Sequence, residues 1–308
     1  MPKNKVQSLA VIGDPISHSL SPAMQNAAIQ KLKAPYRFRA IRVHPEQLAK
    51  FLKGPAQKLA GFNVTLPHKE AIVPLLDRLA YEAKLIGAVN TVLRRGGEWI
   101  GFNTDGAGYL MSLQADRQFS PRGKRVVILG AGGAARALAV ALALAHAKSI
   151  TVANRTVKRA EQLAKELSFR LRGTPLRAIP LGGAKLEAAL RDCHLLINTT
   201  RVGLGGSSFQ DFPWPKLRRG ALVSDIVYSP RVTPFLKAAR RRGHPIHTGE
   251  GMLVFQGALA FEIWSGLKPD ARLMRRELLQ RLREREAKER RGRLSKPAKP
   301  RTRRRAKK

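Results

Sequence analysis

The sequence predicts an α/β protein of two units, and three observations lead to this prediction. Short apolar runs alternate with segments of helical periodicity along most of the chain, which is typical of mostly parallel sheets covered by helices on both faces. A glycine-rich loop, Gly130 to Gly133, separates an expected strand from an expected helix. The length of 308 residues and the hydrophobic content of 44% suffice for two sizeable cores.

The first half of the chain is expected to form one β/α unit. Apolar runs of strand length are Leu9–Ile12, Tyr36–Val43, Gly61–Val64, Ala88–Leu93 and Trp99–Asn103. Helical patterns cover Pro22–Lys33, Pro45–Leu52, Lys69–Leu76 and Tyr81–Ile86. The alternation of the two sets predicts a mostly parallel sheet in this half.

A second alternation starts at Gly123, after an expected connecting helix over Tyr109–Ala115. Expected strands are Arg125–Leu129, Ile150–Ala153, Leu195–Asn198, Leu222–Ile226 and Pro245–His247. Expected helices are Ala134–His146, Val157–Glu166, Thr233–Arg242, Glu250–Ser265 and Pro269–Arg285. Strand, glycine loop, helix and strand in this order predict a Rossmann-type unit that binds a dinucleotide.

The charge of the chain is its unusual global property. It has 58 Lys and Arg residues against 21 Asp and Glu, a net charge of +37. Residues 281–308 hold 15 basic and 3 acidic residues, so the rest of the chain is basic as well. After Arg291 the chain is almost free of large apolar residues, and we expect a disordered tail. Such a tail either contacts nucleic acid or an anionic membrane surface without specificity, or stays solvated and inert.

Other classes of protein are excluded or disfavoured by composition. The single cysteine, Cys193, cannot form an internal disulfide, and its apolar surroundings favour a core thiol. No apolar run is long enough for a transmembrane helix and no signal peptide is evident, so we expect a cytoplasmic protein without membrane insertion. No His, Cys and Asp cluster has metal-ligand spacing, so no metal is predicted.

The glycine loop and the following strand predict which dinucleotide binds. Glycines permit a tight turn and a close approach of the backbone to pyrophosphate, and the next helix offers free N–H groups. An NAD site usually has Asp or Glu at the end of the second strand, whereas this chain has Asn154, Arg155 and Thr156, followed by Lys158 and Arg159. A guanidinium can bind a 2′-phosphate through two hydrogen bonds, which predicts NADP(H). Taken alone, Lys158 and Arg159 also fit a solvated helix face.

Four polar motifs precede the glycine loop, in a fixed order. They are GDPISHSLSP at residues 13–22, NVTLPHK at 63–69, GAVNT at 87–91 and GFNTDG at 101–106. Together with the glycine loop they resemble the shikimate dehydrogenase family, from about residue 7 to about residue 280. The resemblance implies reversible reduction of 3-dehydroshikimate to shikimate with NADPH, a step of chorismate and aromatic amino acid biosynthesis.

The resemblance also implies roles for individual residues. Lys69 and Asp105 match the catalytic pair of the family. The other matched substrate positions are Ser19, Ser21 and Tyr228 for the carboxylate, and Asn63, Thr65, Asn90 and Gln256 for the ring hydroxyls. Matched cofactor positions are Gly130, Ala131, Gly132, Gly133, Ala134, Asn154, Arg155, Thr156, Lys158, Arg159, Thr199, Ile226 and Gly249. Arg201 and Leu204 depart from the family pattern beside Thr199.

Domain limits follow from the same resemblance. A substrate-binding and catalytic domain is expected over residues 1–106, joined by returning helices over 249–285. The Rossmann NADP-binding domain is expected over 107–248, and a basic disordered tail over 286–308. Oligomeric state stays open between monomer and homodimer.

Each substrate position also has a purely structural interpretation. Ser21 before Pro22 suits a helix N-cap, and Asn63 and Asn90 suit turns. Thr65 suits a strand end, and Gln256 a buried helix glutamine bonded to nearby backbone. His18 and His68 invite acid–base roles, but loop packing is the favoured interpretation for both.

Lys69 is the residue with the clearest chemical role. Hydride arrival at a carbonyl carbon builds negative charge on its oxygen, and a nearby ammonium can stabilise that charge and deliver the proton. Asp105 can orient the amine and bind a hydroxyl.

Two rival hypotheses remain. The chain could be a quinate/shikimate dehydrogenase that uses NAD, which Asn154 and Arg155 disfavour. It could also be a catalytically silent nucleic-acid-binding protein on a dehydrogenase fold, which the Lys69 and Asp105 pair disfavours.

Overall fold

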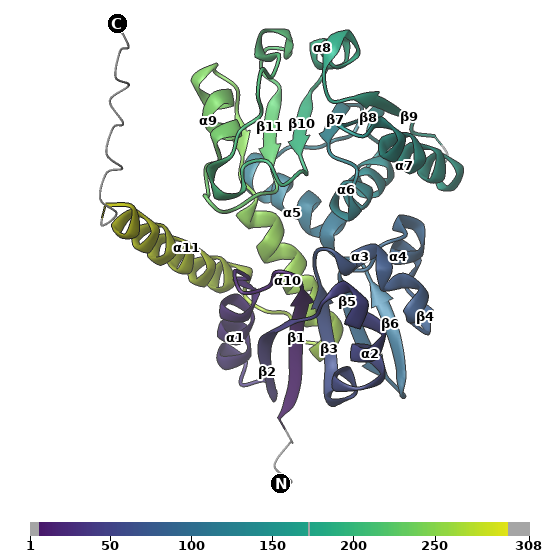
Figure 1. The fold of residues 1–308 in the computed structure, drawn as a ribbon, viewed down its shortest axis with the longest axis vertical. Helices are drawn as coiled ribbons and strands as arrows, with labels where there is room; N and C mark the ends of the chain where they lie inside the picture. The colour runs from purple at the N-terminus through teal and green to yellow at the C-terminus, as the bar shows by residue number, and fades with distance from the viewer. Residues whose placement is uncertain (1–5, 172, 295–308) are drawn as a thin grey trace, which may run out of the picture.

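The computed structural model describes residues 6–171 and 173–294. It holds two six-stranded sheets, one above the other in Figure 1, with helices packed around each. Two long helices, α5 (Asp105–Arg117) and α10 (Glu250–Ser265), run between the sheets. The predicted α/β class is therefore confirmed.

The first sheet has the strand order β2-β1-β3-β5-β6-β4. Its strands are β1 (Gln7–Gly13), β2 (Tyr36–Arg42), β3 (Leu59–Val64), β4 (Arg78–Leu79), β5 (Thr91–Arg95) and β6 (Glu98–Phe102). Strands β2, β1 and β3 are parallel, whereas β5 is antiparallel to both β3 and β6. The hairpin between β5 and β6 turns at Gly96 and Gly97, both with positive φ, which glycine adopts at little cost.

Helices α1 (Ser21–Lys31), α2 (Leu48–Lys53), α3 (His68–Ala71) and α4 (Tyr81–Ile86) belong to the first half. The prediction of one helix over residues 69–76 is wrong. Helix α3 ends at Ala71, and a separate 3-10 turn covers Val73–Leu75. Pro74 explains the break, because proline has no N–H to continue the helical hydrogen bonds. A 3-10 turn at Pro45–Gln47 likewise precedes α2.

The second sheet is entirely parallel, in the order β12-β11-β10-β7-β8-β9. This order is that of doubly wound dinucleotide-binding sheets, with the switch point between β7 and β10. The strands are β7 (Arg125–Leu129), β8 (Ser149–Asn154), β9 (Leu176–Pro180), β10 (Leu195–Asn198), β11 (Leu222–Asp225) and β12 (Ile246–His247). Around them lie α6 (Gly133–Leu144), α7 (Val157–Arg170), α8 (Gly183–Arg191) and α9 (Pro234–Arg241).

Helix α10 brings the chain back to the first sheet. Val254, Phe261 and Trp264 of α10 share one buried cluster with Leu9 and Val11 of β1. The Trp264 indole donates a hydrogen bond to the Val92 carbonyl over 2.9 Å. Within the described residues, no helix is long and apolar enough to cross a membrane.

The last helix, α11 (Ala271–Leu294), is longer than the sequence suggested. A disordered tail was expected from residue 286, and for residues 286–294 that prediction is wrong. Arg, Glu, Lys and Leu favour helix, and Glu284 accepts hydrogen bonds from Gln280 and Arg281 along the exposed side. The rest of the expected tail, residues 295–308, lies outside the described residues.

Candidate functional site

Polar side chains from three of the four early motifs, those at residues 63–69, 87–91 and 101–106, meet with Gln256 of α10 in one network. They come from the end of β3, from α3, from the bend before β5, from the first turn of α5 and from α10. Each stands at the end of an element or on a helix face. Their positions are therefore set by packing of the elements around them.

Lys69 and Asp105 form a direct ion pair, with Lys69 Nζ 2.5 Å from Asp105 Oδ2. The side chains are 16% and 5% exposed, so the pair is largely shielded from water. The other carboxylate oxygen, Oδ1, accepts a hydrogen bond from Asn90 Nδ2 over 2.8 Å. Asp105 is held on both sides, and it fixes the ammonium at one place in the site.

Asn90 is the centre of the buried hydrogen-bond network. Its amide group donates to Asp105 and Thr104, and its Oδ1 accepts from the Thr104 backbone N–H over 2.9 Å. It also lies 3.3 Å from Gln256 Oε1 on α10. Asn90 sits at a bend, but this network shows that its side chain does more than form a turn. Thr104 was not among the predicted residues, although it belongs to the GFNTDG motif.

Asn63, near the end of β3, and Thr65, just after it, differ in burial and in hydrogen bonding. Asn63 is buried and donates to the Asn90 carbonyl at 3.1 Å and to Thr91 Oγ1 at 3.0 Å. Thr65 is partly buried, and its backbone N–H donates to the Ile12 carbonyl. A Cβ at Gly13 would lie 2.5 Å from the Thr65 methyl group, so Gly13 permits this approach.

Ser21 is not the N-cap that the sequence allowed. It is the first residue of α1, Leu20 occupies the N-cap position, and no side chain caps the helix. The Ser21 backbone N–H donates to Ser19 Oγ over 3.4 Å, which brings the two serines together. Because the Ser21 hydroxyl is not engaged in capping, it can serve a ligand.

Tyr228 lies in the segment after β11. It packs against the same buried cluster as Leu20. Burial raises the pKa of the Tyr228 phenol above its usual value, so the group stays a neutral donor. A protonated phenol is a hydrogen-bond donor that suits a carboxylate ligand.

Gln256 bonds both within its own helix and to residues of the network. Its Nε2 donates to the Leu253 carbonyl within α10 over 2.8 Å, as a structural glutamine would. Its Oε1 faces Asn90, and its backbone carbonyl accepts from Thr104 Oγ1 over 3.0 Å. Gln256 therefore fixes α10 to the first turn of α5.

His68 and Cys193 are buried among protein atoms, whereas His18 is exposed. His68 is buried, and its Nε2 lies 2.7 Å from the Val43 carbonyl oxygen, as expected for a packing role. His18 is exposed in the loop before α1. Cys193 is fully buried, and burial raises the pKa of its thiol to about 12. Among the described residues no group of His, Cys, Asp and Glu could hold a metal ion.

The glycine loop connects β7 to α6 beside Lys69. Gly130 has a φ of 110°, and a Cβ there would lie 2.7 Å from Thr199 Oγ1. Around Gly132 there is open space, and Gly133 begins α6. Ala131 and Ala134 flank these positions, both partly buried. The close packing, the open space and the free helix N-terminus together fit a pyrophosphate.

The end of β8 offers positive charge without a carboxylate. Asn154 closes the strand, and its Nδ2 donates to the Thr156 carbonyl over 2.9 Å. Arg155, Lys158 and Arg159 are exposed on the turn and the first turn of α7. Within the described part of the chain, none of the three forms an ion pair with an acidic side chain. These donors fit a 2′-phosphate.

The remaining cofactor positions lie at the ends of β10 and β11. Thr199 Oγ1 donates to the Leu129 carbonyl over 2.8 Å. A Cβ at Gly249 would meet the Ile226 carbonyl and lie 2.8 Å from the Asp225 carbonyl, so only glycine fits there. Asp225 accepts hydrogen bonds from Asn198, Thr233 and the Val227 N–H, while burial raises its pKa to about 7.

Three family models match the chain. A shikimate dehydrogenase substrate-binding domain covers residues 11–92, and a shikimate/quinate 5-dehydrogenase model covers residues 113–202. A shikimate 5′-dehydrogenase C-terminal domain covers residues 249–279. The shikimate dehydrogenase (NADP⁺) of Geobacter metallireducens is 44% identical over 276 residues, covering 89% of this chain and 96% of that protein.

Solved structures show the same architecture. Shikimate 5-dehydrogenase from Thermus thermophilus in complex with NADP(H) and shikimate has a TM-score of 0.77 and 40% identity, covering 89% of this chain and 99% of that one. The ligand-free 5-ketofructose reductase of a Gluconobacter species has a TM-score of 0.79 and 37% identity, covering 90% and 99%. The fold is therefore shared by proteins with different named substrates.

Proposed function

The chain belongs to the shikimate dehydrogenase family, and from this we propose that it reduces 3-dehydroshikimate reversibly to shikimate with NADPH. The proposal rests on one observation above all. The Lys69–Asp105 ion pair lies beside the glycine loop, because a Cβ at Gly133 would be 3.4 Å from Lys69 Cβ. A proton donor and a nucleotide loop are thus adjacent, as reduction of a carbonyl requires.

We assign the substrate contacts by their chemistry. Ser19, Ser21 and the protonated Tyr228 phenol are donors for the carboxylate of the substrate. Asn63, Thr65, Asn90 and Gln256 surround the Lys69–Asp105 pair with amide and hydroxyl groups, which suit the ring hydroxyls. Donors and acceptors fixed by a buried network discriminate against substrates that lack the matching groups.

Lys69 has the chemical role. When bound, NADPH supplies the hydride. The Lys69 ammonium stabilises the charge that develops on the substrate oxygen and delivers a proton to it. Asp105 positions the ammonium through Oδ2 and is itself held by Asn90 through Oδ1. The largely buried pair keeps competing water away from the reacting oxygen.

The cofactor residues favour NADP(H). Gly130, Gly132 and Gly133 with the α6 N-terminus would hold the pyrophosphate. Arg155, with Lys158 and Arg159 nearby, would hold the 2′-phosphate by charge-assisted hydrogen bonds. Thr199, Ile226 and Gly249 would border the nicotinamide side. A cytoplasmic location and the choice between monomer and homodimer stay predictions.

A spectrophotometric assay tests the proposal. Purified protein is given shikimate with NADP⁺, and NADPH formation is followed by absorbance, with quinate and NAD⁺ as parallel alternatives. We expect turnover with shikimate and NADP⁺ well above every other pair. A preference for quinate with NAD⁺ would support the rival dehydrogenase, and no turnover with any pair would support the silent binding protein.

A further inference from the structure

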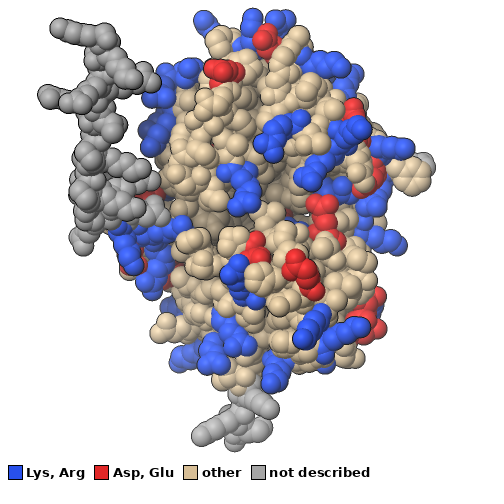
Figure 2. Space-filling view, in the orientation of Figure 1, with Lys and Arg blue, Asp and Glu red and all other residues tan. Residues whose placement is uncertain are grey.

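We propose that the side of the molecule formed by α11 and the adjoining arginine pocket binds the phosphate backbone of a nucleic acid. This surface, the basic flank, comprises Arg117, Arg231 and Arg275 at the pocket and Arg281, Arg283 and Lys288 along α11. It is separate from the Lys69–Asp105 site and has no part in the proposed dehydrogenase reaction. Figure 2 shows Lys and Arg over both halves of one face, with a group of them beside α11 at the left.

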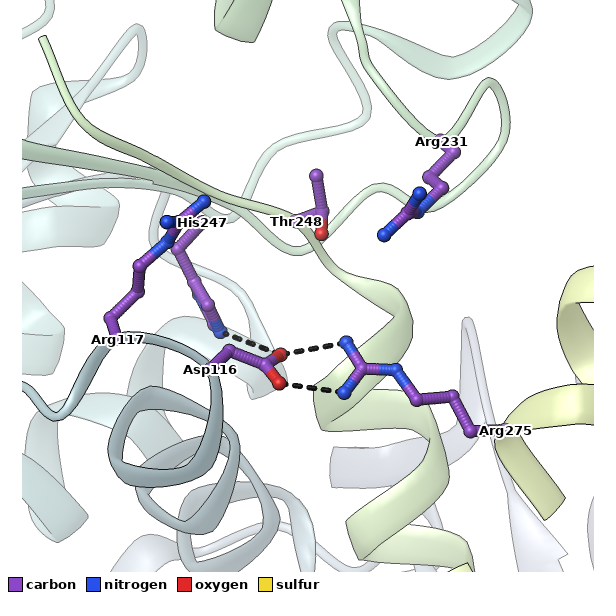
Figure 3. Close-up of a pocket in the computed structure, with 6 residues that line it drawn as sticks. All are labelled: Asp116, Arg117, Arg231, His247, Thr248 and Arg275. Atoms are coloured by element: carbon purple, nitrogen blue, oxygen red, sulfur yellow. Dashed lines mark hydrogen bonds and ion pairs between the residues drawn. The ribbon is translucent and has the colours of Figure 1, made fainter. Parts of the chain in front are cut away.

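The pocket has a cavity of about 230 Å³ lined by three arginines. Arg275 forms a bidentate ion pair with Asp116, with N–O distances of 2.6 and 2.8 Å. Arg231 Nε lies 2.8 Å from Glu250 Oε1. Figure 3 shows Arg117 to the left of the Asp116–Arg275 pair and Arg231 above it, with Thr248 between the two arginines.

The pocket keeps an excess of positive charge. Among the described side chains, no carboxylate forms an ion pair with Arg117. His247 adds no charge, because burial lowers its pKa to about 4. Three guanidinium groups therefore face two carboxylates, and the donors that remain suit a phosphate oxygen.

Helix α11 extends the positive charge away from the pocket. Its buried residues, Met274, Leu278 and Leu282, lie four residues apart and pack into the core. Beyond Leu282 no described residue of α11 is buried, and Arg283 and Lys288 are exposed. The Arg231 N–H donates to Glu286 Oε1 over 3.3 Å, which holds this part of the helix against the pocket loop. Pocket and helix thus form one continuous surface.

The family's chemistry does not account for this charge. The C-terminal family model ends at residue 279, whereas residues 281–308 hold 15 basic and 3 acidic residues. Glu284 is already paired with Arg281 at 3.0 Å. A cluster of this kind attracts a polyanion, because each phosphate that it neutralises releases bound counterions.

The residues favour nucleic acid over a membrane surface. A helix that lies on a membrane needs an exposed apolar face, and the apolar side of α11 is buried against the protein. From residue 283 onward Leu294 is the only large apolar residue. The last aromatic residue is Trp264, so α11 offers no aromatic side chain that could stack on bases. Recognition of the phosphate backbone, without sequence preference, fits these residues.

The test compares two full-length variants that lose the same charge. R117Q/R283Q/K288Q removes three cations from the basic flank. K50Q/K53Q/K58Q removes three exposed cations from α2 and the turn after it, on the other side of the first sheet (Figure 1). Binding of a labelled duplex of about 24 base pairs is measured by fluorescence anisotropy between about 25 and 250 mM KCl, where backbone binding depends steeply on salt.

We expect the wild-type protein to bind at low salt and to weaken steeply as salt rises. Each lost phosphate contact should reduce the magnitude of the slope of log K against log salt by about 0.9. The slope of the flank variant should therefore be smaller in magnitude by about 2 to 3, whereas the control should keep the wild-type slope. Affinity at low salt should fall at least about tenfold in the flank variant and less than about threefold in the control. Both variants should keep dehydrogenase turnover, which shows that they are folded.

Other outcomes overturn the proposal. If the wild-type protein does not bind the duplex at about 25 mM KCl, the proposal is wrong. It is also wrong if the flank variant and the control lose the same affinity for the duplex. Tighter binding to phosphatidylserine vesicles than to the duplex, at matched salt, would assign the flank to membranes instead. A chain ending at Leu294 removes eight basic residues without touching any described element. Unchanged affinity in both this chain and the flank variant would exclude the surface.

Discussion

Gly133 lies directly against Lys69, because a Cβ on Gly133 would be 3.4 Å from Lys69 Cβ and 3.6 Å from Lys69 Cδ. The first residue of the nucleotide-loop helix therefore touches the residue that we assign as proton donor. Lys69 is in α3, which belongs to the first half of the chain, and Gly133 begins α6, which packs around the second sheet. Their contact shows that the proposed active site forms where the two halves of the chain meet.

Replacement of Lys69 with alanine should remove the proton donor and leave the substrate contacts in place. We expect kcat to fall about 10²- to 10⁴-fold, the usual contribution of general acid catalysis, with little change in the KM for shikimate. Steady-state kinetics with shikimate and NADP⁺ measure both values. Lys53→Ala, at an exposed lysine on α2, is the control. A near-normal kcat in the Lys69 variant would refute the assignment.

Asp105→Asn should slow the reaction because Lys69 is no longer held in position. The new amide keeps an oxygen for Asn90 but loses the charge that holds the ammonium. We expect kcat to fall about 10- to 10²-fold. Because the two residues act as a unit, the double variant with Lys69→Ala should be no slower than Lys69→Ala alone. Fully additive losses would mean that Asp105 acts independently of Lys69.

Arg155→Asp should change the cofactor preference. The substitution puts a carboxylate where we expect the 2′-phosphate, so the KM for NADP⁺ should rise at least about tenfold while that for NAD⁺ changes little. Lys148→Asp reverses a charge just before β8, at the opposite end of the strand from Arg155, and is the matched control. If both substitutions raise the KM for NADP⁺ equally, Arg155 contributes only non-specific electrostatic attraction of the anionic cofactor.

The nucleotide-binding half was more predictable from sequence than the catalytic network. Strand, glycine loop, helix and strand are local patterns, and β7, α6 and β8 lie close to the ranges expected for them. Strand β9 and helix α8 were not predicted. Strand β9 is a partly exposed edge strand in which apolar and polar residues alternate only weakly. The hydrogen bond between Asn90 and Thr104 joins two motifs across 14 residues, and no periodicity reveals such a contact.

Long-range packing explains the other differences. No sequence pattern indicates that α10 returns to the first sheet, because that choice depends on the shape of the cluster around Trp264. Ser21 has a side chain suited to an N-cap, yet Leu20 holds that position. A preference of one residue is small and yields to the packing of the whole helix.

Gly108→Ala tests the crossing between α5 and α10. A Cβ at Gly108 would lie 2.5 Å from the Gln256 backbone nitrogen and 2.8 Å from its Cα. The helices must separate to accept it, so we expect the free energy of unfolding to fall by about 1 to 3 kcal/mol. The KM for shikimate should rise, because Gln256 moves away from Asn90. Gly182→Ala meets open space with an extended backbone and should change stability by less than about 0.5 kcal/mol.

His247 should make the protein less stable in acid. Its ring nitrogens lie 2.8 Å from Ser112 Oγ and 2.9 Å from Ser224 Oγ, and burial lowers its pKa from 6.5 to about 4. Asp116, at 3.8 Å, and Glu250 oppose this shift, whereas Arg117 and Arg275 add to it. Between pH 6.5 and 4 the unfolded chain takes up the proton more readily, so stability falls as the pH falls through this window.

The His247→Gln variant isolates this effect from other titrating groups. The full shift corresponds to about 3 kcal/mol, so the wild type should lose about that much more stability than the variant on going from pH 6.5 to pH 4. Asp225 has the opposite effect in the same range, because its pKa is raised to about 7, and it is present in both proteins. Urea unfolding at several pH values gives the difference directly. His18→Gln, at an exposed imidazole, should follow the wild-type curve. If the His247 variant also follows the wild-type curve, the buried imidazole does not titrate in this range.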